Sequence, residues 1–185
     1  MTARCLTAVI GAAALLGACA SSPTLSGSIE DIGSDAELKA ILFADRTHDY
    51  SDVDLTVFEG RLMLSGTIPS EDGRRKLVEN AWKADGVTQV IDEIFVGDDT
   101  AFGQGVEDSR IDGAIRVKYL TDGDVRSANY KMSVSNGVVY ILGVARDQRE
   151  LDEALKKASE TAGVRSVVSH VVLRSFPPPA PPTSL

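Results

Sequence analysis

The chain contains an internal repeat. Shifted by 77 residues, residues 35–96 align with residues 112–173 without a gap, and nine of the 62 aligned positions are identical. The identities include the glycine pairs Gly60/Gly137 and Gly66/Gly143. Glycine at matched positions indicates a shared backbone turn or a shared close approach of the chain. Each copy is about 60 residues, near the smallest size that sustains its own hydrophobic core. The sequence therefore predicts two small tandem domains of one fold.

The two copies show the same succession of local patterns. Each has a helical pattern, then two alternating apolar segments joined by a turn, then a second helix and a last Val-rich strand. Asn136-Gly137 is a strong hairpin signal, and Gly86 and Gly163 are placed to end the second helices. This order predicts an α+β fold in which two helices cover one face of a three-stranded sheet. The expected ranges are helices from Ser34 and Ser109, helices at 70–84 and 147–161, and last strands at 87–96 and 164–173.

The start of the chain is typical of an exported protein. Arg4 precedes a short apolar stretch, Leu6 to Leu16, which ends in Leu16-Gly17-Ala18-Cys19. The stretch is too short to cross a bilayer, and small residues before a cysteine suit a signal peptidase. These four residues resemble a bacterial lipobox, which implies a signal peptide at 1–18 and lipidation of Cys19. The alternative is a short buried helix with a chance cysteine.

The remaining segments outside the two copies have linker-like compositions. Residues 19–33 are rich in Ser and Gly, which predicts a flexible tether, and residues 176–185 contain five prolines, which predicts an extended tail without a packed core. Cys5 would leave with the signal peptide and Cys19 would carry lipid, so no disulfide is expected. The expected domains are therefore 34–97 and 109–175, joined by a linker at 98–108.

The domain pattern resembles that of a known family. The hairpin glycines, the Gly-Val before each last strand and the lipobox are together similar to the dual BON-domain lipoproteins of the Gram-negative envelope. The likeness is tightest in the second copy, over 116–121, 136–143 and 163–165. The resemblance implies a non-enzymatic protein of the outer membrane that faces the periplasm, binds anionic phospholipid chiefly through its second domain and supports membrane integrity.

The two copies differ in charge. Residues 35–96 carry 7 basic and 13 acidic side chains, a balance of −6, whereas residues 112–173 carry 9 and 8, a balance of +1. Arg110 and Arg174 add to the second copy. The second domain is thus the one that can approach an anionic surface without strong repulsion, although ordinary divergence between copies would also give such a difference.

The helix that opens the second domain holds the candidate lipid site. Ile111, Ile115 and Tyr119 form one apolar stripe, and Leu120 lies just off it. Leu120 is the candidate apolar wedge, and the basic residues beside it are the candidate contacts to phosphate. The alternative is that Leu120 packs into the fold or between the domains. The predicted lipid-binding residues are Arg110, Arg116, Lys118 and Leu120.

No motif in the sequence favours catalysis or a cofactor. His48 and His170 are the only histidines and lie outside any metal or nucleophile motif. The aspartates between 45 and 54 lack the glycine and glutamate of a calcium loop, and Gly103-Gln104-Gly105 indicates a linker. A formal net charge of −8 disfavours nucleic acid. We therefore expect no catalytic or metal site, no cofactor and an anionic phospholipid membrane as partner. The alternative is an adaptor or chaperone-like module that docks another envelope protein, with a hydrolase a distant third.

Overall fold

The computed structural model describes residues 39–40, 47–97 and 104–174, and within them the repeat is a structural repeat. Strands β1 (Val53–Phe58), β2 (Arg61–Ile68) and β3 (Gln89–Val96) form one sheet. Strands β4 (Tyr130–Ser135), β5 (Val138–Ala145) and β6 (Ser166–Leu173) form the other. Each strand of the second sheet begins and ends 77 residues after its counterpart in the first, so the sequence repeat extends to the bounds of every strand.

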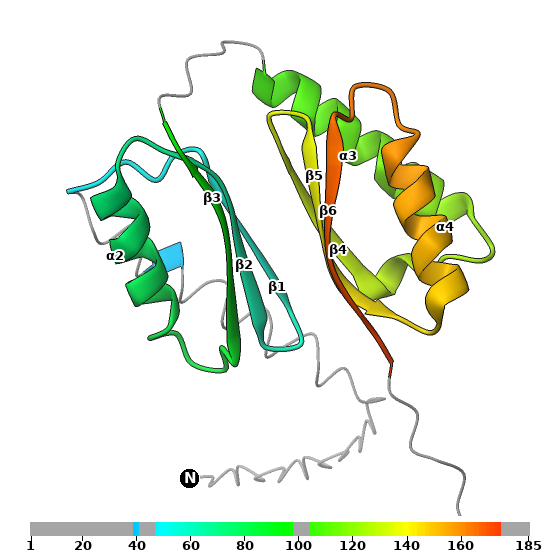
Figure 1. Cartoon of the computed structure of the whole chain (residues 1–185), viewed down its shortest axis with the longest axis horizontal. Helices are drawn as coiled ribbons and strands as arrows, with labels where there is room; N and C mark the ends of the chain where they lie inside the picture. Colours follow the sequence, from blue (N-terminus) through cyan, green and yellow to red (C-terminus); the bar gives the residue numbers. More distant parts are fainter. Residues whose placement is uncertain (1–38, 41–46, 98–103, 175–185) are drawn as a thin grey trace, which may run out of the picture.

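The second module has the predicted order of helix, strand, strand, helix, strand. Helix α3 (Gln104–Thr121) precedes β4 and β5, and α4 (Gln148–Ser159) connects β5 to β6, with a 3-10 turn at Ser127–Asn129 before β4. The strand β4 pairs antiparallel with β5, and β6 pairs parallel with β5. Both helices pack on the same face of this sheet (Figure 1). The core between them contains Ile111, Ile115, Tyr119, Val139, Ile141, Ala154 and Ala158.

The first module repeats this sheet, with β1 antiparallel and β3 parallel to β2. Its helix α2 (Glu71–Ala81) packs on the sheet through Leu77 and Ala81, against Leu62, Leu64 and Ile94. The expected opening helix from Ser34 falls mostly outside the described residues. Lys39 and Ala40 are the part of it that is described, and both are helical. The α+β fold class with two tandem modules is confirmed.

The matched glycines occupy positions that side chains cannot take. Asn136 and Gly137 both have positive φ, 53° and 74°, as do Glu59 and Gly60, so both hairpins close with two left-handed residues. A Cβ on Gly66 would collide with the carbonyl oxygen of Asp52, and one on Gly143 with that of Asn129. The identities in the repeat therefore mark turns and close backbone contacts.

The helix ends differ in part from the sequence prediction. Ser70 and Asp147 cap the N-termini of α2 and α4, as their side chains accept hydrogen bonds from Gly73 N and Glu150 N. Gly86 and Gly163 have positive φ, but α2 ends at Ala81 and α4 at Ser159, so a short turn separates each helix from its glycine.

The start of α3 is the largest departure. The helix begins at Gln104, five residues before Ser109, so the linker expected over Gly103-Gln104-Gly105 and up to residue 108 is helical from 104 onward. The additional helical turns at the start of α3 carry Glu107 and Asp108, whose contacts are described below.

The two sheets pack face to face between outer layers of helix (Figure 1). An apolar cluster joins Phe58, Met63 and Ile91 of the first module to Tyr140, Leu142 and Val144 of the second. Beside it, the hydroxyls of Ser65 and Ser133 lie 2.6 Å apart. The open face of each sheet, which its own helices do not cover, is thus buried by the other module.

Candidate functional site

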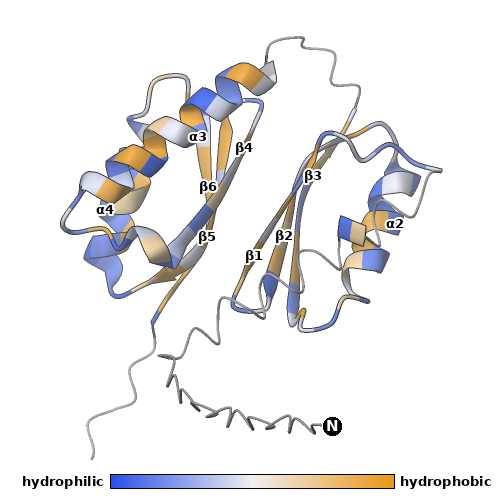
Figure 2. Cartoon of the chain, turned by 180° about the vertical axis from the view of Figure 1, so that it is seen from behind, coloured by the Kyte–Doolittle hydropathy of each residue, from blue (hydrophilic) through white to orange (hydrophobic). Residues whose placement is uncertain are grey.

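Helix α3 is apolar on two opposite faces. Ile111, Ile115 and Tyr119 are buried against the sheet. At 100° per residue, Val106, Gly113, Val117 and Leu120 lie on the side opposite these three, spaced seven, four and three residues apart. We call these four residues the outward stripe. The apolar residues along α3 are visible in Figure 2.

The outward stripe is exposed along its whole length. Val106 is 78% exposed, Val117 60% and Leu120 70%. At Gly113 an added Cβ would meet no atom within 4 Å. Leu120 therefore does not pack into the fold or between the modules, and that alternative for it is wrong. The sequence prediction missed Val106 and Val117 as its companions.

Arg110 and Arg116 flank the outward stripe on its two sides. The Arg110 guanidinium donates to both carboxylate oxygens of Glu107, at 2.6 and 3.0 Å, and to the carbonyl oxygen of Ala162. The Arg116 guanidinium donates to Asp112 at 2.7 Å and to the carbonyl oxygen of Met132. The hydrogen bond from Arg110 lowers the pKa of Glu107 below its ordinary value, which keeps this pair charged on both sides. Each cation beside the stripe thus has a carboxylate partner within α3.

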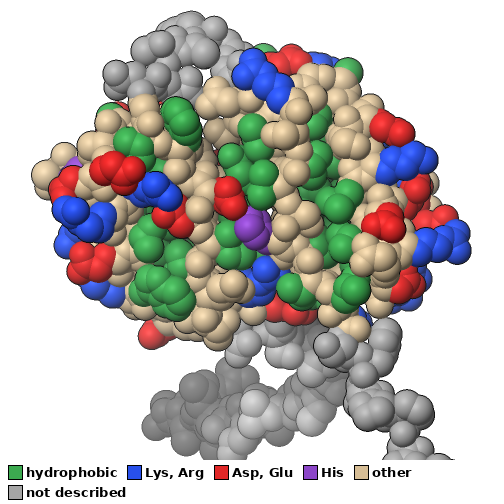
Figure 3. All heavy atoms as spheres, in the orientation of Figure 1, with side chains coloured by type: hydrophobic (Ala, Val, Ile, Leu, Met, Phe, Trp, Pro, Cys, Tyr) green, Lys and Arg blue, Asp and Glu red, His purple; other side chains and the backbone are tan. Residues whose placement is uncertain are grey.

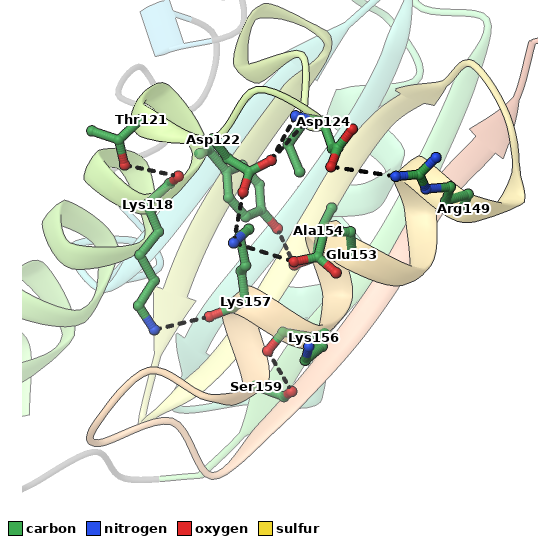
Figure 4. Close-up of polar contacts among 12 residues, drawn as sticks. Lys118, Thr121, Asp122, Asp124, Arg149, Glu153, Ala154, Lys156, Lys157 and Ser159 are labelled. Atoms are coloured by element: carbon green, nitrogen blue, oxygen red, sulfur yellow. Dashed lines mark hydrogen bonds and ion pairs between the residues drawn. The ribbon is translucent and has the colours of Figure 1, made fainter.

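Lys118 points away from the outward stripe. Its ammonium donates to the carbonyl oxygen of Lys157 in the last turn of α4 at 3.2 Å (Figure 4). It also donates to the hydroxyl of Thr161, just beyond α4, at 2.8 Å. A cation at a helix C-terminus satisfies orphan carbonyls there and interacts favourably with the helix dipole. Of the four predicted residues, the structure brings Arg110, Arg116 and Leu120 to the outer side of α3, whereas Lys118 bridges α3 and α4.

Further contacts hold the C-terminal end of α3 in place. The buried Tyr119 hydroxyl donates to the carbonyl oxygen of Ala154 at 2.8 Å. The Lys157 ammonium lies 2.7 Å from Asp122 and 3.2 Å from Glu153 (Figure 4). Burial raises the pKa of Tyr119, so its hydroxyl stays protonated and available as a donor. Leu120 therefore projects from a segment that α4 holds rigidly.

The N-terminal part of α3 is fixed by one buried carboxylate. Asp108 accepts hydrogen bonds from the backbone N–H groups of Asn136 and Gly137, both at 2.8 Å. The Asn136 side chain in turn donates to the Thr67 hydroxyl of the first module at 3.5 Å. This contact accounts for the early start of α3, because it holds the first turns of the helix against the β4–β5 hairpin.

The described part of the chain contains neither a metal-type cluster nor a membrane-spanning helix. Within 39–40, 47–97 and 104–174, no group of three or more His, Cys, Asp or Glu side chains is arranged to hold a metal ion. None of the helices in this part of the chain has the length and apolar character needed to cross a membrane. His48 lies beside Asp72, and His170 beside Glu93 at 2.8 Å. The absence of a catalytic site stays a prediction.

The predicted signal peptide, the lipidation site Cys19, the tether at 19–33 and the Pro-rich tail at 176–185 lie outside the described residues. They therefore remain sequence predictions.

The chain is similar to several known proteins. The chain is 33% identical over 126 residues to an uncharacterised protein of Anaplasma centrale, covering 68% of this chain and 83% of that protein. It is 28% identical over 175 residues to the outer membrane lipoprotein DolP of Haemophilus influenzae, covering 89% and 86% of the two chains. It is also 28% identical over 141 residues to osmotically-inducible protein Y of Escherichia coli, covering 75% and 70%.

The family match covers both modules. The model of the BON domain matches residues 35–98 and again residues 107–175, which together contain both sheets, helices α2 and α4, and all of α3 except its first three residues. The chain therefore belongs to the BON-domain family and carries two BON domains in tandem.

Proposed function

We propose that this protein is a non-enzymatic lipoprotein of the bacterial envelope that binds anionic phospholipid through the outward stripe of α3 and supports the integrity of the outer membrane. In this proposal, lipid on Cys19 anchors the chain to the outer membrane on its periplasmic side. The second BON domain makes the contact with headgroups, and the protein acts by adhesion.

The exposed outward stripe is the observation that carries the proposal. Val106, Val117 and Leu120 are large apolar side chains that α3 presents to solvent although its opposite face already fills the core. A helix that is apolar on both faces is normally covered on both. Inserting a Val or Leu side chain into an apolar layer contributes about 1.5–3 kcal/mol relative to leaving it in water. Three such side chains on one rigid helix suffice for reversible adhesion to a bilayer.

The charges beside the outward stripe favour a membrane that contains anionic phospholipid. Arg110 and Arg116 rim the stripe, and each basic residue near an anionic leaflet contributes about 1 kcal/mol. Their partners Glu107 and Asp112 offset part of this attraction. Apolar insertion is therefore the larger contribution, and the two arginines favour phosphate without dominating the binding.

The relatives support an envelope location. The match to the outer membrane lipoprotein DolP extends over 89% of this chain, which includes residues beyond the two BON domains. That extent agrees with the lipobox-like Leu16-Gly17-Ala18-Cys19 at the start of the chain.

Vesicle flotation tests the proposal. The chain from residue 20 onward, which lacks the lipidation site, is mixed with vesicles of phosphatidylglycerol or phosphatidylcholine. We expect it to float with phosphatidylglycerol. Replacing Val117 and Leu120 together by Glu should lower the binding by more than tenfold, because both insertions are lost and two negative charges are added.

The matched control is Phe95→Glu. Phe95 is 67% exposed, close to the 70% of Leu120, but it lies on β3 of the first module. This variant should float like the parent chain. Equal flotation of the Val117→Glu/Leu120→Glu variant and the parent would overturn the site. Capture of an envelope protein by the parent chain without any lipid binding would instead favour the adaptor function.

A further inference from the structure

The contact between the two modules joins equivalent positions of the repeat. Glu93 and His170 lie 77 residues apart in sequence, and their side chains meet at 2.8 Å. Equivalent positions touch each other only near a two-fold axis that relates the modules. The modules are thus docked as an approximate two-fold pair, like two subunits of a dimer. Hydrophobic side chains are spread over the face of the molecule that Figure 3 shows.

The two-fold relation shows which modules can dock. In the same geometry, two first modules would bring Glu93 against Glu93, and two second modules would bring His170 against His170. A carboxylate facing a carboxylate is repulsive, whereas the observed pair is complementary. The interface therefore selects a first module with a second module and disfavours two first modules.

Arg61 disfavours the other pair of like modules, that of two second modules. Its guanidinium donates to the carbonyl oxygen of His170 at 2.7 Å and to that of Gly143 at 3.4 Å. The equivalent residue in the second module is Val138, whose side chain has no hydrogen-bond donor. A pair of second modules would lose both hydrogen bonds, so Arg61 disfavours that pair, whereas the Glu93 contact disfavours two first modules.

The docked faces do not form the cores of the modules. The second module has its own core between its sheet and α3 and α4, and the first has one against α2. The interface cluster of Phe58, Met63, Ile91, Tyr140, Leu142 and Val144 is separate from both. Each module can therefore keep its core while its docked face changes partner.

The connection between the modules is short for the distance between the elements that it joins. From Val96 at the end of β3 to Gln104 at the start of α3 there are eight residue steps, which span at most about 28 Å. Helix α3 covers the face of its sheet that is remote from the first module (Figure 1). The connection must therefore cross two layer spacings of about 10 Å each. A short connection with little slack favours exchange of domains between chains.

We propose that the docked face of each module also accepts the unlike module of a second copy of this chain, so that two copies exchange modules in a two-fold dimer. The first module of each copy then covers the sheet of the other, through the contacts of Arg61, Glu93 and His170 seen within one chain.

Cysteine trapping tests the exchange. The chain from residue 20 onward contains no cysteine, and the Ser65 and Ser133 hydroxyls lie 2.6 Å apart across the interface. The double variant Ser65→Cys with Ser133→Cys is oxidised and run on a denaturing gel without reductant. Docking within one chain gives a cross-linked monomer. Docking between chains gives a covalent dimer, and Ser65→Cys alone reports chance cross-linking.

The length of the connection provides the decisive comparison. Deleting Thr100 and Ala101 should make the covalent dimer the main species, and inserting about six Gly and Ser residues between them should return the chain to monomer. Dimer in the shortened chain above the level of Ser65→Cys alone supports the exchange. Cross-linked monomer alone in the natural and shortened chains, at every concentration, overturns it. Failure of the shortened chain to cross-link at all, while the lengthened chain does, overturns it as well.

A charge reversal tests the selection of unlike modules. In the shortened chain, His170→Glu places two carboxylates at the two-fold contact and should lower the dimer fraction by about fivefold. Adding Glu93→Lys should restore the fraction. If His170→Glu leaves the dimer fraction unchanged, the contact does not select the partner.

Discussion

The Asp108 carboxylate accepts a hydrogen bond from the Gly137 backbone N–H at 2.8 Å and a second, equally short one from Asn136. A residue of α3 thereby fixes the hairpin whose left-handed turn is needed for the sheet. Hydrogen bonds to a charged acceptor contribute about 1.5–3 kcal/mol each.

The first prediction concerns this contact. Asp108→Ala removes the acceptor of two backbone donors and should lower the free energy of unfolding by about 3 kcal/mol, measured by urea denaturation. Asp124→Ala is the control, because Asp124 is an exposed partner of Arg149 at 3.5 Å and its loss should cost less than about 1 kcal/mol. Equal losses in the two variants would show that Asp108 does not hold the hairpin.

The second prediction concerns pH. Glu150 is 1% exposed and accepts hydrogen bonds from Arg126 N, Arg146 N and the Arg146 guanidinium. Burial raises the pKa of Glu150, but these donors outweigh it, so the pKa lies below its ordinary value of 4.5. As pH falls, Glu150 is therefore protonated in the unfolded chain before it is protonated in the folded chain. The stabilisation from Glu150 is complete above pH 4.5 and is lost as pH falls through the folded-state pKa.

Glu150→Gln should therefore lower the unfolding free energy at pH 7 by about 2 kcal/mol or more, since an amide is a weaker acceptor and brings its own donor. The difference between the variant and the parent should shrink as pH falls below 4.5. Thermal unfolding followed by circular dichroism from pH 7 to pH 3 measures it. A difference that stays constant with pH would show that ionisation of Glu150 is not the source of its contribution.

The third prediction compares two glycines of the second module. A Cβ at Gly143 would strike the Asn129 carbonyl oxygen, whereas one at Gly113 meets open space on a helix. Gly143→Ala should destabilise the protein by about 1–3 kcal/mol. Gly113→Ala should stabilise it by about 0.5–1 kcal/mol, because alanine loses less backbone entropy in a helix. Melting temperatures that shift in the same direction for both variants would contradict this assignment.

The fourth prediction separates apolar insertion from charge at the proposed lipid surface. Raising the salt concentration should weaken binding to phosphatidylglycerol vesicles only modestly, because Glu107 and Asp112 already pair with the two arginines. Arg110→Gln should cost about fivefold in affinity, less than Leu120→Glu. Lys118→Gln should leave binding unchanged, since its ammonium is held by Lys157 and Thr161. A larger loss for Arg110→Gln than for Leu120→Glu would make electrostatic attraction the main contribution.

Much of the fold could be predicted from the repeat, because local sequence sets turns and close contacts. Asn136-Gly137 specifies its hairpin by conformational preference, and the equivalent Glu59-Gly60 turn follows from the alignment. The start of α3 could not be predicted in the same way. Gly103-Gln104-Gly105 has a linker composition, and the first turns of α3 depend on the tertiary contact of Asp108 with the hairpin.

The candidate site was predicted in part for a similar reason. Helical spacing identified the buried residues Ile111, Ile115 and Tyr119 and placed Leu120 beside them. Val106 was missed because the helix was expected to start after it. The seven-residue spacing of Val106, Gly113 and Leu120 becomes visible only when the helix is extended to Gln104. The docking of the sheets depends on contacts far apart in sequence, such as Ser65 with Ser133, and no local pattern predicts them.

The outward stripe contributes nothing to the core on which α3 folds, so selection can alter it at little structural cost. Related chains are then free to adjust how strongly, and to which surface, this helix adheres while the scaffold beneath it stays the same. One side of α3 is constrained by folding, and the other is open to adaptation.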